Sequence, residues 1–371
     1  MSDAMNAIFE DSLKEFLKPV EKLLADPNIS EIMINGHEEI FYEQSGKIIK
    51  SDCAFENEAS LLAAARNISQ YVGKRIHEKD PILDARLPDG SRICIVIPPC
   101  AKNGTTIAIR KFAQEKLGLQ ELINFGAMSK DMARFLDIAT ILRRNILVSG
   151  GTGSGKTTLL NVLGSRIPGN ERTLIIEDTA ELQIKSQHVV RFETQHEDEM
   201  GKGKVEIRDL IKASLRLRPD RIIVGEVRGP EALDLVQAMN TGHDGSMGTL
   251  HANNPVQGMN RLETLCMLGD VGVPAQVIRL QVADAVHLVV QANRLRDGSR
   301  KITYISEILG LKNDEYHVQD LFRFNQTGVD EDGKFLGHFE GCGNLPSFAE
   351  MIQNSGIPFN FNIFKTQKKA A

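Results

Sequence analysis

The amino-acid sequence predicts an α/β protein in which a smaller α+β domain precedes a larger domain with a mostly parallel sheet. Three observations support this fold class. The chain has 371 residues, which is enough for about two domains. Its first 112 residues place short strands and tight turns around two helices. From residue 145 onward, short apolar strands alternate with helices, the pattern of a parallel sheet with helical crossovers.

The first domain is expected at 1–112. Apolar residues recur at helical spacing in two segments, while strand-like segments alternate apolar and polar residues around Asn-Gly, Ser-Gly and Asp-Gly turns. The expected elements are helices at 11–24 and 58–75 and strands within 31–51, 81–99 and 104–112.

The second domain is expected at 131–313, after a linker at 113–130 in which Ser129 is placed to cap a helix. Residues 284–310 predict two strands joined by an Asp297-Gly298 hairpin. Residues 314–371 are expected to form a C-terminal extension with one further strand.

Composition excludes several classes of protein. The chain is 42% hydrophobic and 25% charged, as soluble globular proteins are, and its net charge of −5 gives no basic field for nucleic acid. Five dispersed cysteines indicate free thiols in a reducing compartment. No apolar stretch approaches the length of a membrane span. We therefore expect a cytoplasmic protein that contacts a membrane peripherally and does not bind nucleic acid directly.

A phosphate-binding loop follows the first apolar strand of the second domain. NILVSGGTGSGKTTLLNVL contains Gly-x-x-x-x-Gly-Lys-Thr between a strand and a helix, which is the context that a P-loop requires. Backbone N–H groups of such a loop converge on phosphate oxygens at a helix N-terminus. Lys156 would reach the β- and γ-phosphates of ATP, and the Thr157 hydroxyl would ligate Mg²⁺. The expected nucleotide-binding residues are Gly151, Thr152, Gly153, Ser154, Gly155, Lys156, Thr157 and Thr158.

Two apolar strands farther along the chain end in acidic residues. TLIIEDTAEL carries Glu177 and Glu181, and DRIIVGEVRG carries Glu226 after Gly225. A P-loop enzyme needs such acids for Mg²⁺ and for the attacking water. The usual Walker B strand ends in an aspartate, and here a glycine takes its place. We expect Glu226 to orient or activate water, while Glu177 and Glu181 share the metal-side work and are not separated by the sequence.

The segment GHDGSMGTLHA (242–252) combines three glycines with His243 and His251. The spacing of the two histidines fits neither one helical face nor a zinc site. A flexible turn is one interpretation. In the other, GTLHA is a strand whose end carries His251 to the γ-phosphate, on a loop whose glycines let it shift when phosphate leaves.

As a set, four segments resemble the secretion traffic ATPases: SGGTGSGKTTLLN, IIEDTAELQ, LRPDRIIVGEVRG and AMNTGHDGSMGTLHANNP. In that superfamily they are the Walker A, Asp box, Walker B and His box segments. Within it, the chain is similar to the CpaF-type ATPases of tight-adherence (Tad/Flp) pili. LPDGSR, RLRDGSRKITYISEILG and LPSF also resemble that group, and the resemblance covers about residues 11–350.

The resemblance implies a homo-oligomer, a hexameric ring in which a RecA-like P-loop ATPase domain and the N-terminal domain close on nucleotide between subunits. Its implied partners are the pilus platform proteins of the inner membrane. Enzymes that transfer a γ-phosphate use arginine fingers, and Arg92 and Arg110 are our candidates, the alternative being a solvated basic face. Neighbouring or further basic residues are Arg86, Lys111, Arg216, Arg218, Arg221 and Arg228.

Three functions remain open at this point. The first is a Mg-ATP-hydrolysing motor for pilus assembly or retraction. The second is a type IV secretion ATPase that moves DNA or effector proteins, with the same nucleotide chemistry. The third is an ATP-dependent assembly scaffold with little turnover, which the missing Walker B aspartate would favour. A direct DNA motor is disfavoured by the acidic net charge and by the absence of Trp.

Overall fold

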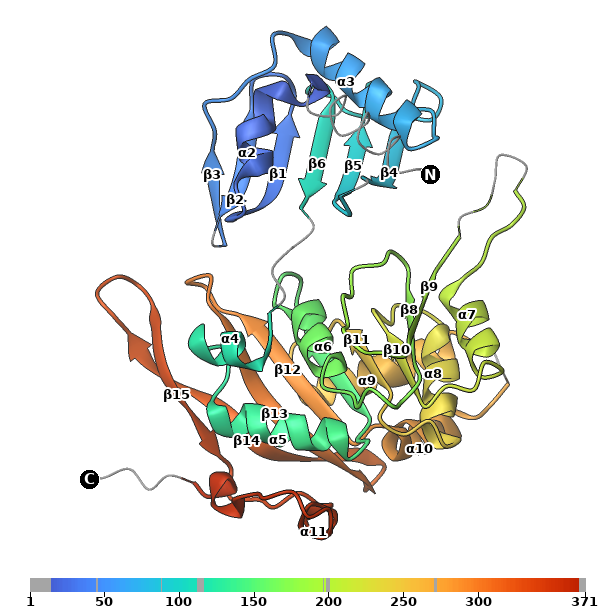
Figure 1. The fold of residues 1–371 in the computed structure, drawn as a ribbon, viewed down its shortest axis with the longest axis vertical. Helices are drawn as coiled ribbons and strands as arrows, with labels where there is room; N and C mark the ends of the chain where they lie inside the picture. The colour runs from blue at the N-terminus through green and yellow to red at the C-terminus, as the bar shows by residue number, and fades with distance from the viewer. Residues whose placement is uncertain are drawn as a thin grey trace. The chain divides into compact units, whose positions relative to one another are not determined.

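The structure is a computed structural model that describes residues 15–44, 46–87, 89–111, 117–195, 197, 201–269 and 272–366. The chain divides into two compact units, Met1–Lys116 and Leu117–Ala371 (Figure 1). The first unit corresponds to the expected α+β domain, and the second contains the strands and helices of the expected parallel-sheet domain.

A six-stranded antiparallel sheet forms the first unit, in the order β3-β2-β1-β6-β5-β4. Alternate residues such as Ile32, Ile93 and Ile109 are buried, because successive strand side chains point to opposite faces. Leu61 and Ile68 of α3 pack in the same core. The elements are η1 (Lys18–Val20), α2 (Glu21–Ala25), β1 (Ile29–Asn35), β2 (Ile40–Gln44), β3 (Lys47–Lys50), α3 (Glu58–Tyr71), β4 (Ile82–Arg86), β5 (Arg92–Val96) and β6 (Thr106–Arg110).

Helix α3 and the strands of this unit confirm the expected elements. The Asn57 side chain accepts from the Ser60 N–H, and this capping box begins α3. The helix expected at 11–24 is broken in its described part. Pro19 lies in the first turn of η1, and a new helical turn, α2, begins at Glu21. Residues 11–14 lie outside the described residues.

The second unit is built on a nine-stranded sheet in the order β15-β14-β13-β12-β7-β11-β10-β8-β9 (Figure 1). The strands from β12 to β9 run parallel, and β13, β14 and β15 continue the sheet antiparallel. The strands are β7 (Ile146–Gly150), β8 (Thr173–Glu177), β9 (Val189–Glu193), β10 (Arg221–Val224), β11 (Met247–Leu250), β12 (Leu288–Arg294), β13 (Arg300–Lys312), β14 (Glu315–Val329) and β15 (Phe335–Gly341).

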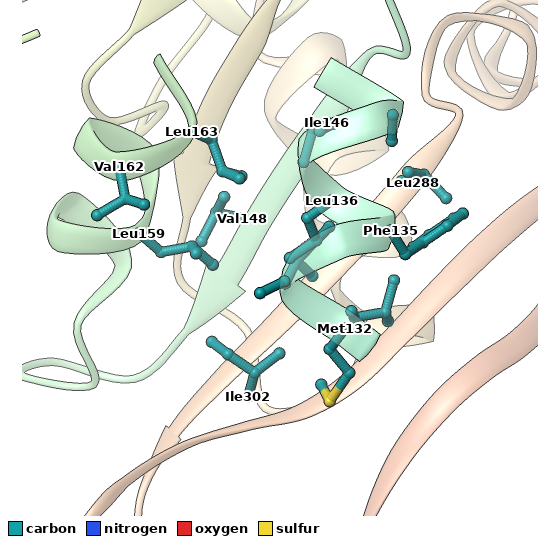
Figure 2. Packing of buried hydrophobic residues seen from close by; sticks show 14 of the residues in the cluster. Met132, Phe135, Leu136, Ile146, Val148, Leu159, Val162, Leu163, Leu288 and Ile302 are labelled. Atoms are coloured by element: carbon teal, nitrogen blue, oxygen red, sulfur yellow. The ribbon is translucent and has the colours of Figure 1, made fainter. Parts of the chain in front are cut away.

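Helices cover both faces of this sheet. On one face, α5 and α6 pack with Ile146 and Val148 of β7 and with Leu288 of β12 (Figure 2). On the other face, Leu147 and Val289 pack with the helices α7 to α10. The helices are α4 (Leu119–Asn124), α5 (Lys130–Ile141), α6 (Lys156–Gly164), α7 (Ile207–Ser214), α8 (Glu231–Asn240), α9 (Pro255–Met267), α10 (Ala275–Ala285), α11 (Ala349–Asn354) and η2 (Phe361–Phe364).

Two segments differ in role from the sequence expectation. Within the expected linker, α4 packs Leu122 into the core of the second unit, although the Ser129 side chain does cap α5 as expected. Within the expected C-terminal extension, β14 and β15 join the main sheet. Phe364 meets Phe135 of α5 edge-on, with ring centroids 5.4 Å apart. Both segments are therefore parts of the second unit and not appendages to it.

The β12–β13 hairpin confirms the turn predicted at Asp297 and Gly298. The position of this hairpin in the sheet was not predicted. β12 pairs directly with β7, so that its end lies beside the loop that follows β7. This neighbourhood brings sequence positions about 140 residues apart to the same edge of the sheet.

Candidate active site

The loop from Gly151 to Gly155 joins the carboxyl end of β7 to the first turn of α6, as a P-loop requires. Gly155 caps α6 with φ 95° and Gly153 has φ 68°, conformations that favour glycine. A Cβ at Gly150 would lie 2.1 Å from the Ala292 carbonyl oxygen, so only glycine fits there. The Lys156 ammonium donates to the Gly151 carbonyl at 2.9 Å and so folds back over the loop.

The loop fits a nucleotide polyphosphate. It opens at the N-terminus of α6, where backbone N–H groups and the helix dipole attract anions. The Ser154 hydroxyl is buried beside the loop and has no hydrogen-bond partner among the described residues. The residues expected from the sequence, from Gly151 to Thr158, lie together in this loop and in the first turn of α6.

Glu177 and Glu181, which the sequence did not separate, occupy different places. Glu177 ends β8 and is buried, and its Oε1 atom accepts the N–H groups of Glu181 (2.9 Å) and Leu182 (3.0 Å). Glu181 lies on the loop that these bonds hold, and its side chain is half-buried. Farther along, the Gln183 N–H donates to Asn161 of α6 at 2.8 Å. The loop that carries Glu181 is therefore fixed to the P-loop helix.

Glu226 follows β10, and its carboxylate lies between the side chains of Arg228 and His251. Its Oε2 atom accepts from Arg228 at 2.7 Å, and its Oε1 atom lies 2.8 Å from the His251 Nε2 atom. Partial burial raises the pKa of Glu226, but the hydrogen bond and charge of Arg228, with smaller contributions from His251 and Lys156, outweigh burial. The net effect is a pKa below the ordinary value, so Glu226 is ionised at neutral pH.

His251 follows β11 and reaches the same edge of the sheet as Glu226. Partial burial and then the charge of Lys156 lower its pKa, and the nearby Glu226 carboxylate only partly opposes them. With a pKa below its ordinary value, the imidazole is neutral at pH 7. A neutral His251 can donate one hydrogen bond and accept another, as a phosphate contact needs.

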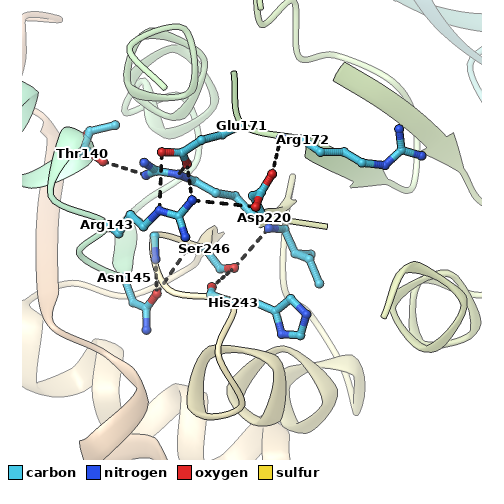
Figure 3. A network of polar contacts seen from close by, with 11 residues as sticks. Thr140, Arg143, Asn145, Glu171, Arg172, Asp220, His243 and Ser246 are labelled. Carbon is cyan, nitrogen blue, oxygen red and sulfur yellow. Dashed lines mark hydrogen bonds and ion pairs between the residues drawn. The ribbon is translucent and has the colours of Figure 1, made fainter. Parts of the chain in front are cut away.

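The two histidines of GHDGSMGTLHA lie at opposite ends of β11. His243 lies in a turn at the amino end, where the Ser246 hydroxyl donates to its carbonyl at 2.6 Å (Figure 3). The expectation that the glycines loosen the loop of His251 was wrong. Gly242 and Gly245 belong to the far turn, with φ 96° and 85°, and Gly248 is buried within β11. The loop that carries His251 after β11 therefore contains none of the three glycines.

The basic residues of the second unit proposed from sequence have distinct surroundings. Arg221 is fully buried at the amino end of β10, where it pairs with Glu171 at 2.5 Å. It therefore cannot serve as an arginine finger, because burial and pairing hold it in the core. Arg228 contacts Glu226, and Arg216 and Arg218 are exposed after α7.

In the first unit, three arginines form one row across neighbouring strands. Arg110 of β6 lies directly opposite Arg92 of β5, which in turn lies opposite Arg86 of β4. Residues directly opposite share a face of the sheet, and here it is the face away from the Ile109 core. The Lys111 ammonium instead donates to the Asp26 carbonyl at 2.6 Å and leaves the row. Glu31 of β1 lies opposite Arg110 and continues the row, and an Asp84 oxygen lies 3.9 Å from the Arg92 guanidinium.

Three polar residues near the P-loop, at the carboxyl end of the parallel strands, were not predicted from the sequence. Gln291 of β12 is buried, accepts from Ser149 just before the P-loop, and donates to the Ala252 carbonyl just after His251 at 3.1 Å. Arg300 donates from Nε to the Gly153 carbonyl at 2.9 Å, and Arg294 also approaches Gly153. The only sequence signal was the basic hairpin RLRDGSRK, which does not reveal its neighbour.

Among the described residues, no three His, Cys, Asp or Glu side chains gather as a ready-made metal site. An Mg²⁺ ion bound with nucleotide does not need such a cluster, since phosphate oxygens and water complete its coordination. The P-loop hydroxyl and nearby carboxylates have the oxygen chemistry that Mg²⁺ prefers. No helix in the described ranges is long and apolar enough to cross a membrane.

Comparison with known proteins identifies the family. The model of the family "Type II/IV secretion system protein" matches residues 14–334. A putative conjugal transfer protein of Mycobacterium tuberculosis is 33% identical over 306 residues, which cover 81% of this chain and 86% of the relative. The type IV secretion system protein VirB11 of Bartonella henselae is 32% identical over 327 residues, covering 78% of this chain and 91% of VirB11.

Solved structures share the fold. The pilus retraction motor PilT with bound ADP superimposes with a TM-score of 0.55 at 19% identity, covering 83% of this chain and 82% of PilT. The ATPase DotB of Legionella pneumophila gives a TM-score of 0.54 at 21% identity, covering 79% of each chain. The second unit thus has a RecA-like fold and follows a smaller domain in the chain. The extent of these matches places the chain in the type II/IV secretion system protein family, as an ATPase of that family.

Proposed function

We propose that this chain is the subunit of a hexameric ring that hydrolyses Mg-ATP to drive assembly or retraction of a Tad/Flp-type pilus. In this proposal the ring acts in the cytoplasm, peripherally at the inner membrane, on platform proteins of the pilus. The observation that carries the hydrolytic part is the meeting of the P-loop, the Glu181 loop, Glu226 and His251 at one edge of a parallel sheet. The pilus part rests on the motifs LPDGSR, RLRDGSRKITYISEILG and LPSF.

Residues at this edge divide the work. The P-loop amides and Lys156 bind the phosphates, and Thr157 with the neighbouring acids would hold Mg²⁺. The metal, when bound, neutralises charge that develops on the β- and γ-phosphate oxygens. Glu226, ionised at neutral pH, orients the attacking water or takes its proton. Glu177 positions the loop of Glu181 through its two backbone bonds, and Glu181 supplies the second reactive carboxylate.

His251 contacts the γ-phosphate in this scheme. The His251 Nε2 atom lies 2.8 Å from the Glu226 Oε1 atom. Loss of the γ-phosphate would therefore change the surroundings of the Glu226 carboxylate. Gln291 extends the same contact to the strand before the P-loop through Ser149 and Ala252. The buried Gln291 amide thus joins the two loops on either side of the phosphate site.

Arg92 and Arg110 are proposed to complete the site of a neighbouring subunit in the ring. The row that they form with Arg86 would neutralise the charge of the transferring phosphoryl group, which is the part that arginine fingers supply. A site completed between subunits ties hydrolysis to assembly and makes per-subunit turnover depend on protein concentration.

Transport of DNA or effector proteins by a type IV secretion system is the second candidate. It is favoured by the conjugal transfer proteins and VirB11 among the relatives. The scaffold alternative is weakened because the buried Glu177 carboxyl lies against Gly225, close to where a Walker B aspartate would be. An acid is therefore present at that strand end despite the glycine.

The first experiment measures ATP turnover per subunit as protein concentration rises, for wild type, Lys156→Ala, Glu226→Gln and Arg92→Gln/Arg110→Gln. We expect wild-type turnover to climb with concentration, and the Lys156 and Glu226 variants to be inactive. Mixing the arginine variant with Glu226→Gln should restore part of the activity, because each supplies what the other lacks. Flat turnover near zero in wild type, with nucleotide bound, would establish the scaffold instead.

The cargo is tested in cells that lack the gene and carry either wild type or Glu226→Gln. Surface pili and plasmid or effector transfer are scored in the same strains. Loss of pili with normal transfer supports the pilus motor. Loss of transfer with normal pili would assign the chain to a secretion channel.

A further inference from the structure

The β12–β13 hairpin lies against the P-loop. Arg300 donates from Nε to the Gly153 carbonyl at 2.9 Å, and its Cδ atom lies 3.6 Å from where a Cβ of Gly155 would be. Arg294 approaches the same loop, with its Nη1 atom 3.4 Å from where a Cβ of Gly153 would be. Two guanidinium groups therefore border the glycines that approach phosphate.

Strand register places both arginines on one face of the sheet. Arg294 and Arg300 are directly opposite each other across the hairpin. Arg294 lies on the same face of β12 as Ala292 and Val290, because every second residue of a strand points to the same side. Ala292 and Val290 belong to the core on the α5 and α6 face. The P-loop leads into α6 on that same face.

Three hydrogen bonds to other segments of the second unit hold the hairpin in place. The Lys301 ammonium donates to the Gly126 carbonyl at 2.6 Å, and the Ile302 N–H donates to the Ala127 carbonyl at 2.8 Å. The Asp297 carboxylate accepts the Phe335 N–H at 2.9 Å and so joins the hairpin to the start of β15. These bonds fix the backbone that carries the arginines, so their approach to the loop is preorganised.

The arginines approach from the side of β7 that is opposite to the catalytic acids. Sheet order places β12 on one side of β7, and β11 and β10, with His251 and Glu226, on the other. Groups that act on the γ-phosphate gather on the β10 and β11 side. The backbone N–H groups of a P-loop cradle the α- and β-phosphates, and the hairpin borders the glycines of this loop.

We propose that Arg294 and Arg300 form a cis clamp on the α- and β-phosphates of the nucleotide bound by the same subunit. This clamp rests on nucleotide binding at the P-loop, as in the proposed function, but not on hydrolysis in a ring. It holds ATP and ADP alike, since both carry these two phosphates. It is distinct from the arginine row of the first unit, which is proposed to act on the transferring γ-phosphoryl group.

The test compares Arg294→Gln, Arg300→Gln and the double variant with wild type, in the full chain. Arg296→Gln is the matched control, because it removes the same charge from the exposed turn of the same hairpin. Dissociation constants are measured for fluorescent ADP and for a fluorescent non-hydrolysable ATP analogue. We expect each single clamp variant to bind both nucleotides about tenfold more weakly, with the loss of activity mainly in KM. Arg296→Gln should bind as wild type does.

A second measurement separates direct contact from a loosened P-loop. The dependence of ADP affinity on salt concentration should be shallower in the double variant, because two phosphate contacts are gone. Arg294→Lys keeps the charge and should recover much of the affinity. An unchanged salt dependence, or weaker binding of the ATP analogue alone, would overturn the clamp. If wild type bound neither nucleotide, the proposed function would fall as well, whereas equal binding by wild type and the double variant would refute only the clamp.

Discussion

A Cβ atom at Gly225 would lie 2.9 Å from the Cγ atom of Glu177 and 3.3 Å from its Oε1 atom. The two residues end neighbouring parallel strands, β10 and β8. Glu177 is buried here and uses the same Oε1 atom to hold the N–H groups of Glu181 and Leu182. Because Gly225 at the Walker B position has no side chain, the Glu177 side chain can occupy the space beside it.

Gly225→Ala should disturb the active site through Glu177. The added methyl group must displace the Glu177 side chain, which costs about 1–3 kcal/mol of stability as overpacking does. We expect ATP turnover to fall at least about tenfold as the Glu181 loop shifts. Thermal unfolding and steady-state turnover measure the two effects. Gly328→Ala is the control, since no atom lies within 4 Å of its added Cβ. Normal turnover in Gly225→Ala would show that the Glu177 position is not needed.

Substitution should separate the roles of Glu177 and Glu181. Glu181→Gln keeps the loop in place and should lower kcat about 100-fold or more, with little change in thermal midpoint. Glu177→Ala removes the acceptor of two backbone N–H groups within a buried site, so it should lower both stability and turnover. The measurements are kcat and the unfolding midpoint of each variant. The reverse pattern, with a stable but inactive Glu177→Ala and an active Glu181→Gln, would assign the catalytic carboxylate to Glu177.

Stability should depend on pH through His287. Burial and the nearby Arg144 lower the pKa of His287 to about 4, and its Nδ1 atom accepts the Asn145 N–H at 2.8 Å. The unfolded chain binds the proton near pH 6.5, so the folded state loses stability as pH falls from about 6.5 to 4, by about 3 kcal/mol. Protonation also removes the acceptor for Asn145.

His287→Asn serves as the non-titrating comparison for that prediction, because its side-chain oxygen can accept the same N–H. Chemical denaturation of both proteins at several pH values gives the two stability curves. We expect the curves to diverge only below about pH 6.5. Parallel curves from pH 7 to pH 4 would mean that His287 does not carry this pH dependence.

The sequence was sufficient where a feature depends on neighbouring residues in the chain. The P-loop, the Ser129 cap and the Asp-Gly hairpin at 297–298 are local, and the structure contains each of them. The fit of Glu177 against Gly225 joins two strands far apart in the chain, so no spacing reveals it.

Strand order was the main feature that sequence could not supply. Because β12 lies beside β7, Gln291 and the two hairpin arginines reach the P-loop, and no pattern in one chain indicates that adjacency. The amphipathic pattern of β14 and β15 was also too weak to show that they extend the sheet. In GHDGSMGTLHA the sequence predicted a strand that ends near His251, as β11 does, but it did not show that the glycines lie before and within that strand.

The buried pair Arg221–Glu171 should govern stability and leave catalysis unaffected. Arg221 is fully buried and donates to Glu171 at 2.5 Å and to the Thr140 carbonyl at 2.6 Å. It begins β10, whereas the P-loop follows the end of the parallel strand β7, so the two lie at opposite ends of the sheet. Glu171→Ala leaves this guanidinium without its carboxylate and should cost about 3–5 kcal/mol. Arg221→Met with Glu171→Leu removes both charges and should cost less than Glu171→Ala alone. Urea denaturation of the double variant and of the single variants Arg221→Met and Glu171→Leu gives the coupling energy, and Glu171→Ala is measured beside them. Turnover per folded subunit should stay near wild type in the double variant, and a large loss in kcat would show that the far end of the sheet communicates with the active site.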